Sequence, residues 1–257
     1  MDFDMPQPLS RVHPKVTSVM WTSDALASKP EMAEFVASII SLSTEIDHEL
    51  KLLMARMLGA KQRAALAIYS LLETHRLERA ALRAAAKATL TCDEFRIFDA
   101  VMSGARSAQS ERHRLAHWHW GLCHDLPDAL LLTDPKYLQM IRTKQHLTFR
   151  AAPGTFTLEE VDDAWNFDYS KILVYRSDDL ERAKRDLIES RIIFAEFDIF
   201  LNPSLTPQDV EQYGLAPDHP STRSGALKKL SSIRLFREAL DRHQPSNKRP
   251  QLQNKEP

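Results

Sequence analysis

The sequence predicts a mainly α-helical protein, with a four-helix bundle, a C-terminal helical extension and a small β-hairpin. Only 6 of the 257 residues are glycine, while alanine and leucine are abundant, and this balance favours helices over sandwiches or barrels. Apolar residues recur at spacings of three and four through four long segments. The connections between these segments are short, which is typical of antiparallel neighbouring helices.

The first helix is expected from Pro30 to residue 58, since proline suits a first helical turn and Gly59 suits the end. Two further helices are expected over 61–72 and 75–89. Thr91 and Glu94 have the spacing of a capping box and open a fourth helix that is expected to run to Gly121.

The pattern changes after residue 121. The expected elements are strands at 129–132 and 171–176 that pair with each other, helices at 136–144, 178–201 and 224–240, and loops at 145–168 and 202–223. The chain then divides into four predicted parts: a flexible N-terminal arm (1–28), the helical bundle (29–125), short strands with a packing helix (126–201), and a loop, short helix and disordered tail (202–257).

Charge and composition limit the classes of function. The formal net charge is −1, so RNA contact would have to come from a local basic patch. The two cysteines, Cys92 and Cys123, form no CxxC motif, which favours a reducing cytoplasm. The N-terminus lacks the pattern of a secretory signal, and no apolar run reaches 18 residues, so no membrane association is expected.

Residues 111–120, Glu-Arg-His-Arg-Leu-Ala-His-Trp-His-Trp, are the densest cluster of chemically capable groups. Arginine can offset charge on a phosphate, and histidine can move protons near neutral pH. Arg112 and His117 are therefore the candidate pair for phosphodiester chemistry. Five residues along a helix correspond to a rotation of about 140°, so the pair does not share one face. Either the long arginine side chain bridges the gap or a second chain supplies the partner.

The string Arg112-His113-x-x-x-His117, near the end of the last long predicted helix, resembles the signature of the HEPN superfamily, in which arginine is followed by four to six residues and then histidine. The stretches Trp-His-Trp-Gly (118–121) and Pro-Asp-Ala-Leu-Leu-Leu (127–132) also resemble uncharacterised bacterial HEPN-like proteins. The resemblance covers about residues 30–135 and extends in weaker form toward residue 200. His113 stands where asparagine is common in the family.

This resemblance implies a metal-independent endoribonuclease that acts at a homodimer cleft, uses no cofactor and leaves 2′,3′-cyclic phosphate ends. His117 would move the protons, Arg112 would hold the phosphate, and His113 would orient either of them. The family also implies a toxin–antitoxin or defence role with an antitoxin or other protein partner. Further RNA contacts are expected from the basic and aromatic residues around the motif, Arg106, Arg114, Trp118 and Trp120.

Three alternatives remain open for the same residues. They can form a solvated helix end, because cations favour helix C-termini, in a non-catalytic interaction or dimerisation module. They can bind RNA without cleaving it. His113 and His117, at i and i+4, can also share a transition metal with Cys123, His124 or Asp125. An open cleft lined by Arg112 and His117 would favour catalysis, whereas burial or hydrogen bonding within the fold would favour a structural role.

Overall fold

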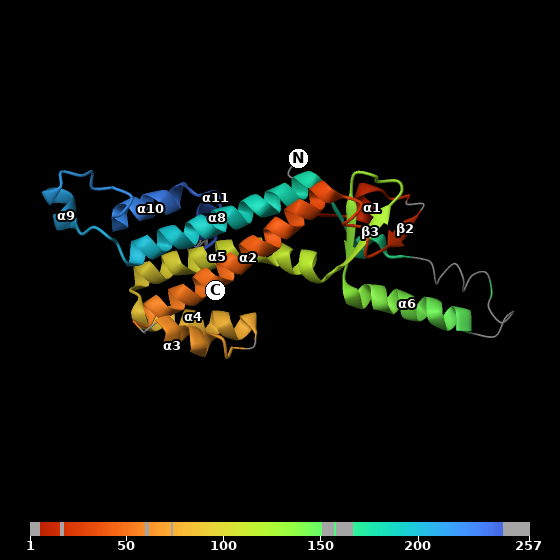
Figure 1. The fold of residues 1–257 in the computed structure, drawn as a ribbon, viewed down its shortest axis with the longest axis horizontal. Coiled ribbons are helices and arrows are strands. Elements are labelled where there is room, and N and C mark those ends of the chain that lie inside the picture. The colour runs from red at the N-terminus through yellow and green to blue at the C-terminus, as the bar shows by residue number, and fades with distance from the viewer. Residues whose placement is uncertain are drawn as a thin grey trace, which may run out of the picture. The chain divides into compact units, whose positions relative to one another are not determined.

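The computed structural model describes residues 6–15, 18–59, 62–72, 74–150, 157 and 167–243, and it is mainly helical, as the sequence predicts. Figure 1 shows the order of the elements along the chain. The helices are α1 (Leu9–Val12), α2 (Pro30–Met57), α3 (Gln62–Tyr69), α4 (His75–Thr89), α5 (Cys92–His117), α6 (Pro135–Arg150), the short 3₁₀ helix η1 (Tyr169–Lys171), α8 (Ser177–Leu201), α9 (Pro207–Gln212), α10 (Arg223–Ser232) and α11 (Arg234–His243).

The chain forms two compact units, each built from two separated stretches. The first unit combines Met1–Thr44 with Ala108–Ile188, and the second combines Glu45–Ser107 with Glu189–Pro257. The boundaries fall inside α2, α5 and α8, so each of these helices contributes to both units. The unit boundaries thus lie within helices rather than at the linkers that the sequence suggests.

The predicted end of α2 and the predicted start of α5 are confirmed. Gly59 follows α2 with a φ of 57°, a left-handed conformation that glycine adopts without strain. The backbone N–H of Thr91 donates to Glu94 Oε2 (2.8 Å) and the backbone N–H of Glu94 donates to Thr91 Oγ1 (3.4 Å), which completes the capping box of α5.

A five-stranded antiparallel sheet in the first unit replaces the predicted hairpin. Its strands are β1 (Gln7–Pro8), β2 (Val19–Trp21), β3 (His119–Cys123), β4 (Leu130–Thr133) and β5 (Ile172–Tyr175), in the order β1-β5-β4-β3-β2. The predicted pairing of β4 with β5 is confirmed, with Leu131 opposite Val174. These two strands are separated in sequence by α6, and the chain-adjacent pair is β3 with β4.

The N-terminal region, expected to be a flexible arm, supplies both edge strands of this sheet. β1 pairs with β5, and β2 pairs with β3. Leu9 of α1 is fully buried against one face of the sheet, in a core with Leu131, Ile172 and Val174. The apolar contacts of α1 explain why so short a segment is ordered. Figure 1 shows α1 beside the strands.

The prediction that α5 runs to Gly121 is wrong, because α5 ends at His117 and β3 begins at His119. Trp118 therefore lies in the connection, and Trp120 lies on a strand. Gly121 has a role in the sheet: it faces Trp21 across β2 and β3, and an added Cβ would lie 2.6 Å from the indole ring of Trp21. Alternation and strand pairing outweigh helical propensity in this stretch.

Three further segments differ from prediction. The helix expected over 136–144 extends as α6 to Arg150, so it includes the start of the predicted loop. The second predicted loop contains α9. The helix expected over 224–240 is divided into α10 and α11 by Ile233, whose backbone is extended. The backbone N–H of Leu235 donates to Glu189 Oε2 (3.3 Å), which satisfies a donor at the new helix start.

The second unit is held by aromatic packing between α5 and α8. The rings of Phe98 and Phe197 lie 6.2 Å apart, and Arg223 lies over the ring of Phe200 at 4.2 Å. Arg223 also donates to Glu94 Oε1 (2.5 Å) and so connects α10 to the start of α5. The predicted disordered tail lies outside the described residues from position 244 onward. Among the described helices, none is long and apolar enough to cross a membrane.

Candidate functional site

The two candidate histidines lie together on the last turns of α5. His113 and His117 are both exposed, and their ring centroids lie 4.9 Å apart, as the i and i+4 spacing predicts. Each imidazole can exchange protons with solvent or with a ligand. The C-terminal end of α5 therefore carries two neighbouring imidazoles that can take part in proton transfer.

Arg112 has a different environment from the histidines. Its side chain is half-buried, and among the described residues its Nε is buried without a hydrogen-bond partner. A buried N–H that donates to nothing loses its hydration without compensation, typically at a cost of about 1–3 kcal/mol. Because this atom is enclosed, an anionic oxygen could reach it only if the side chain moved.

Arg114 belongs to a network inside the first unit. It donates to Glu111 Oε1 (2.7 Å), and the buried Tyr175 hydroxyl donates to Glu111 Oε2 (2.7 Å). Burial and the adjacent Glu111 carboxylate raise the pKa of Tyr175, so the phenol stays protonated as a donor. The guanidinium of Arg114 lies 5.8 Å from the ring centroid of Trp118. These contacts connect β5, α5 and the connection to β3, and they give Arg114 a structural role beside its predicted RNA contact.

The other predicted RNA contacts are distributed more widely. Arg106 is exposed on α5 but belongs to the second unit. Trp118 and Trp120 are half-buried in the first unit, where they line a groove of about 360 Å³ with Trp21, His119 and Arg142. Sequence reasoning identified the two tryptophans but not the groove, because Trp21 and Arg142 come from distant parts of the chain.

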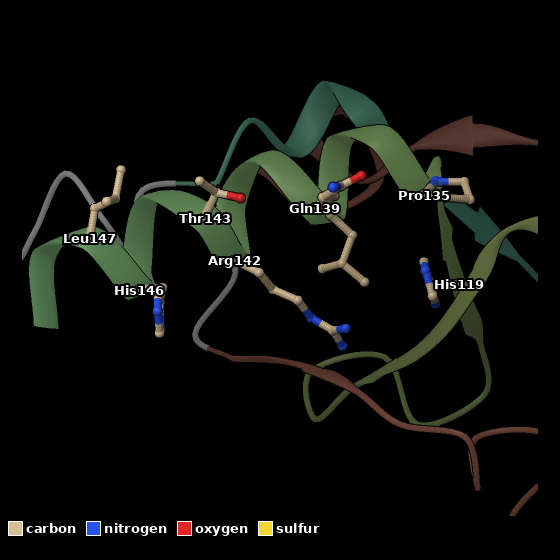
Figure 2. A pocket seen from close by; sticks show the side chains of 8 residues that line it. His119, Pro135, Gln139, Arg142, Thr143, His146 and Leu147 are labelled. Carbon is tan, nitrogen blue, oxygen red and sulfur yellow. The ribbon is translucent and has the colours of Figure 1, made fainter. Parts of the chain in front are cut away.

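A second groove, of about 570 Å³, adjoins the first and shares His119 and Arg142 with it. It lies along α6, and its lining residues are His119, Pro135, Leu138, Gln139, Arg142, Thr143, His146 and Leu147. Figure 2 shows Arg142 extending from α6 toward His119, with His146 on the same side of the helix. Neither groove is lined by Arg112, His113 or His117.

Helix α6 is rich in basic residues. Its sixteen residues contain four lysines or arginines and no aspartate or glutamate. Among the described residues, Arg142 forms no ion pair and is exposed. A count of charges along 135–150 could have revealed this patch from the sequence, whereas its position beside His119 depends on the turn from β4 into α6.

The metal alternative gains no support from the geometry. In the part of the chain that the structure describes, no group of three or more His, Cys, Asp or Glu side chains is placed to hold a metal ion. Cys123 is buried in the sheet, and its Sγ lies 4.0 Å from Asp125 Oδ2. His113 and His117 therefore form a pair of ligands at most.

No family model, curated protein or solved structure matches this chain. Its function therefore has to be inferred from the chemistry of its own residues.

Proposed function

We propose that this protein is an endoribonuclease of HEPN type that cleaves RNA without a metal ion, at a site formed by two copies of the chain. The observation that carries the proposal is the exposed His113–His117 pair, 4.9 Å apart between ring centroids, directly beside Arg112. A cytoplasmic homodimer in a toxin–antitoxin or defence system, with an antitoxin partner, is the setting that the resemblance implies.

The reaction is a transesterification within the RNA strand. His117 takes the proton from a ribose 2′-hydroxyl, and the 2′-oxygen forms a bond to the adjacent phosphorus. The bond between phosphorus and the 5′-oxygen breaks, and a second, protonated imidazole gives that oxygen a proton. The products are a 2′,3′-cyclic phosphate and a free 5′-hydroxyl, so atoms and charge balance with no co-reactant.

Arg112 offsets the charge that grows on the phosphate oxygens. A guanidinium binds phosphate through two parallel N–H donors, and the enclosed Nε of Arg112, which has no partner among the described residues, would become such a donor if the side chain moved. The bond is strengthened by the partial burial of the side chain, because water competes less for the donor. His113 lies between Arg112 and His117 in sequence and contacts His117, which suits an orienting role.

A second copy of the chain would bring together residues that one helix holds apart. The rotation of about 140° between Arg112 and His117 separates them around α5. Neither Arg112 nor His117 lines either of the two grooves of the first unit. Two helix ends brought face to face would form two equivalent sites, each with Arg112 of one copy beside the His113–His117 pair of the other.

The substitution His117→Ala tests the proposal on total RNA and transfer RNA. We expect cleavage to fall by about 10²–10⁴-fold, because one proton-transfer group is lost, while circular dichroism stays unchanged. His48→Ala, at an exposed histidine of α2, is the matched control and should cleave at the wild-type rate. Equal cleavage by wild type and His117→Ala would refute the assignment.

Mixing two inactive variants tests the requirement for two copies. If a site combines Arg112 of one copy with His117 of the other, a mixture of Arg112→Ala and His117→Ala should recover up to about half of the activity in heterodimers that retain one complete site. Sedimentation velocity measures whether the variants still pair. If the mixture forms dimers but recovers no cleavage activity, both residues belong to a site within one chain.

RNA binding without cleavage is the second candidate, and the separation of the grooves from the motif favours it. A wild-type protein that binds RNA but produces no 2′,3′-cyclic phosphate would support this candidate over the nuclease.

A further inference from the structure

We infer that the two adjoining grooves between α6 and β3 hold single-stranded RNA, with a phosphate at Arg142 and bases against the exposed parts of Trp118 and Trp120. The choice of RNA as the ligand rests on the proposed function. The grooves indicate that this RNA is single-stranded and which residues contact it. The sequence identified Trp118 and Trp120 as RNA contacts, whereas Arg142 and the grooves themselves come from the structure.

The first argument is charge. Arg142 lines both grooves, and His119 lines both beside it, so a positive group lies where the two grooves meet. Among the described lining residues of either groove there is no carboxylate. The acidic residues nearest to the lining in sequence are Asp24 and Asp134, and Asp134 Oδ1 accepts from the backbone N–H of Lys136 (2.7 Å) at the start of α6. The grooves therefore favour an anion.

The second argument is the spacing of groups along α6. Arg142 and His146 are one turn apart and project from the same side of the helix (Figure 2). One turn of helix advances about 5.4 Å, which is close to the separation of successive phosphates in an extended strand. The groove can follow a nucleic-acid backbone over more than one phosphate.

The third argument is the pair of tryptophans at the other end of the composite groove. Trp118 is fixed on one side by Arg114, whose guanidinium is held by Glu111. Trp120 is fixed by strand pairing, opposite Leu132. Ring faces held in place at the edge of a cationic groove favour stacking of unpaired bases, which a duplex does not expose. Single-stranded RNA therefore fits better than duplex RNA.

The test uses fluorescence polarisation of a labelled twelve-residue oligouridylate, with every variant made in the His117→Ala background so that the probe is not consumed. Arg142→Ala should weaken binding by about tenfold and reduce the log–log salt slope by about one. Lys136→Ala removes the same charge from an exposed position of the same helix that lines neither groove, and it should change binding by less than about twofold. Trp120→Ala should weaken binding by at least about fivefold.

Each remaining outcome overturns one part of the inference. Equal losses in Arg142→Ala and Lys136→Ala would mean that the whole helix attracts RNA diffusely and that no groove is used. Duplex RNA that binds as tightly as the oligouridylate would refute the single-stranded assignment. Loss of binding in Arg142→Ala, combined with a wild type that never cleaves RNA, would retain the groove and refute the nuclease. Wild-type cleavage with an unchanged KM in an Arg142→Ala protein that keeps His117 would retain the nuclease and refute the groove.

Discussion

The end of α5 and the grooves along α6 contain the same kinds of side chain but differ in how the fold uses them. At the end of α5, Arg112, His113 and His117 lie within six consecutive residues. The two histidines are exposed, but they line neither groove. Along α6, Arg142 and His119 come from different elements and line two grooves. A dense motif in the sequence therefore need not coincide with the concave surface that a polymer substrate requires.

Under the two proposals, RNA is cleaved at the end of α5 and bound along α6, both within the first unit. The two regions are joined by few residues, since His117 is followed directly by Trp118. The hydrogen bonds from Tyr175 to Glu111 and from Arg114 to Glu111 fix the connection. Substitutions that affect one region without the other can separate the two roles.

The largest effect is expected from Gly121→Ala, which disturbs the strands that line the groove and leaves the motif at the end of α5 unchanged. The new Cβ would lie 2.6 Å from Trp21 Cε3 and 2.9 Å from the Met20 carbonyl oxygen, and the backbone oxygen cannot move without disturbing β2. We expect the free energy of unfolding to fall by about 1–3 kcal/mol and oligouridylate binding to weaken with it. Thermal melts and fluorescence polarisation measure both effects.

Gly104→Ala is the control for this substitution, because its Cβ would make only an ordinary contact of 3.5 Å with the Leu235 carbonyl oxygen. In Gly121→Ala, RNA cleavage should decrease through a higher KM with kcat retained. A decrease in kcat at unchanged KM would mean that the groove and the motif form one site.

Tyr175→Phe sharpens the comparison, because it alters the network that connects the two regions. Removing the hydroxyl takes one hydrogen bond from the Glu111 carboxylate and should lower the free energy of unfolding by about 1–2 kcal/mol. Glu111 should then hold Arg114 less firmly, and because the Arg114 guanidinium lies by the ring of Trp118, the fluorescence of Trp118 should also change. Chemical denaturation followed by tryptophan emission detects both changes. Tyr213→Phe, at an exposed tyrosine, should have neither effect, and an equal loss in the two variants would contradict the network.

The smallest effect is expected from Glu94→Gln, which tests stability outside the first unit. The backbone N–H of Thr91 and the side chain of Arg223 hold the pKa of Glu94 below its ordinary value of 4.5. Its stabilising contribution is therefore complete above pH 4.5 and is lost as the pH falls through the lowered pKa. We expect Glu94→Gln to lower the free energy of unfolding by about 1 kcal/mol or less at pH 7 and to approach the wild type in acid.

Urea titrations between pH 3 and pH 7 measure this difference, and Glu211→Gln, at an exposed position of the same unit, is the control. A difference between Glu94→Gln and wild type that grows in acid would contradict the direction of the pKa shift. RNA binding at neutral pH should be equal in the two proteins, because the capping box lies in the second unit.

The sequence alone determined the long helices and much of the motif. Periodic apolar residues, the Thr91–Glu94 box and Gly59 act within one helix, so the bounds of α2, α4 and α8 and the start of α5 follow from local pattern. The same locality places His113 and His117 on one face. The β4–β5 pairing was also predictable, because both strands are continuous apolar runs between turn signals.

Only the tertiary structure decided the rest. β1, β2 and β3 contain two to five residues each, too few for a period, and they are stabilised by partners far away in the sequence. The end of α5 at His117 follows from the pairing of β3 with β2 and β4. The meeting of Trp21, His119 and Arg142 in one groove likewise depends on strand pairing and on the direction in which α6 leaves β4. Local physics specified which helices form and where their polar groups lie, whereas non-local pairing specified which of those groups share a surface.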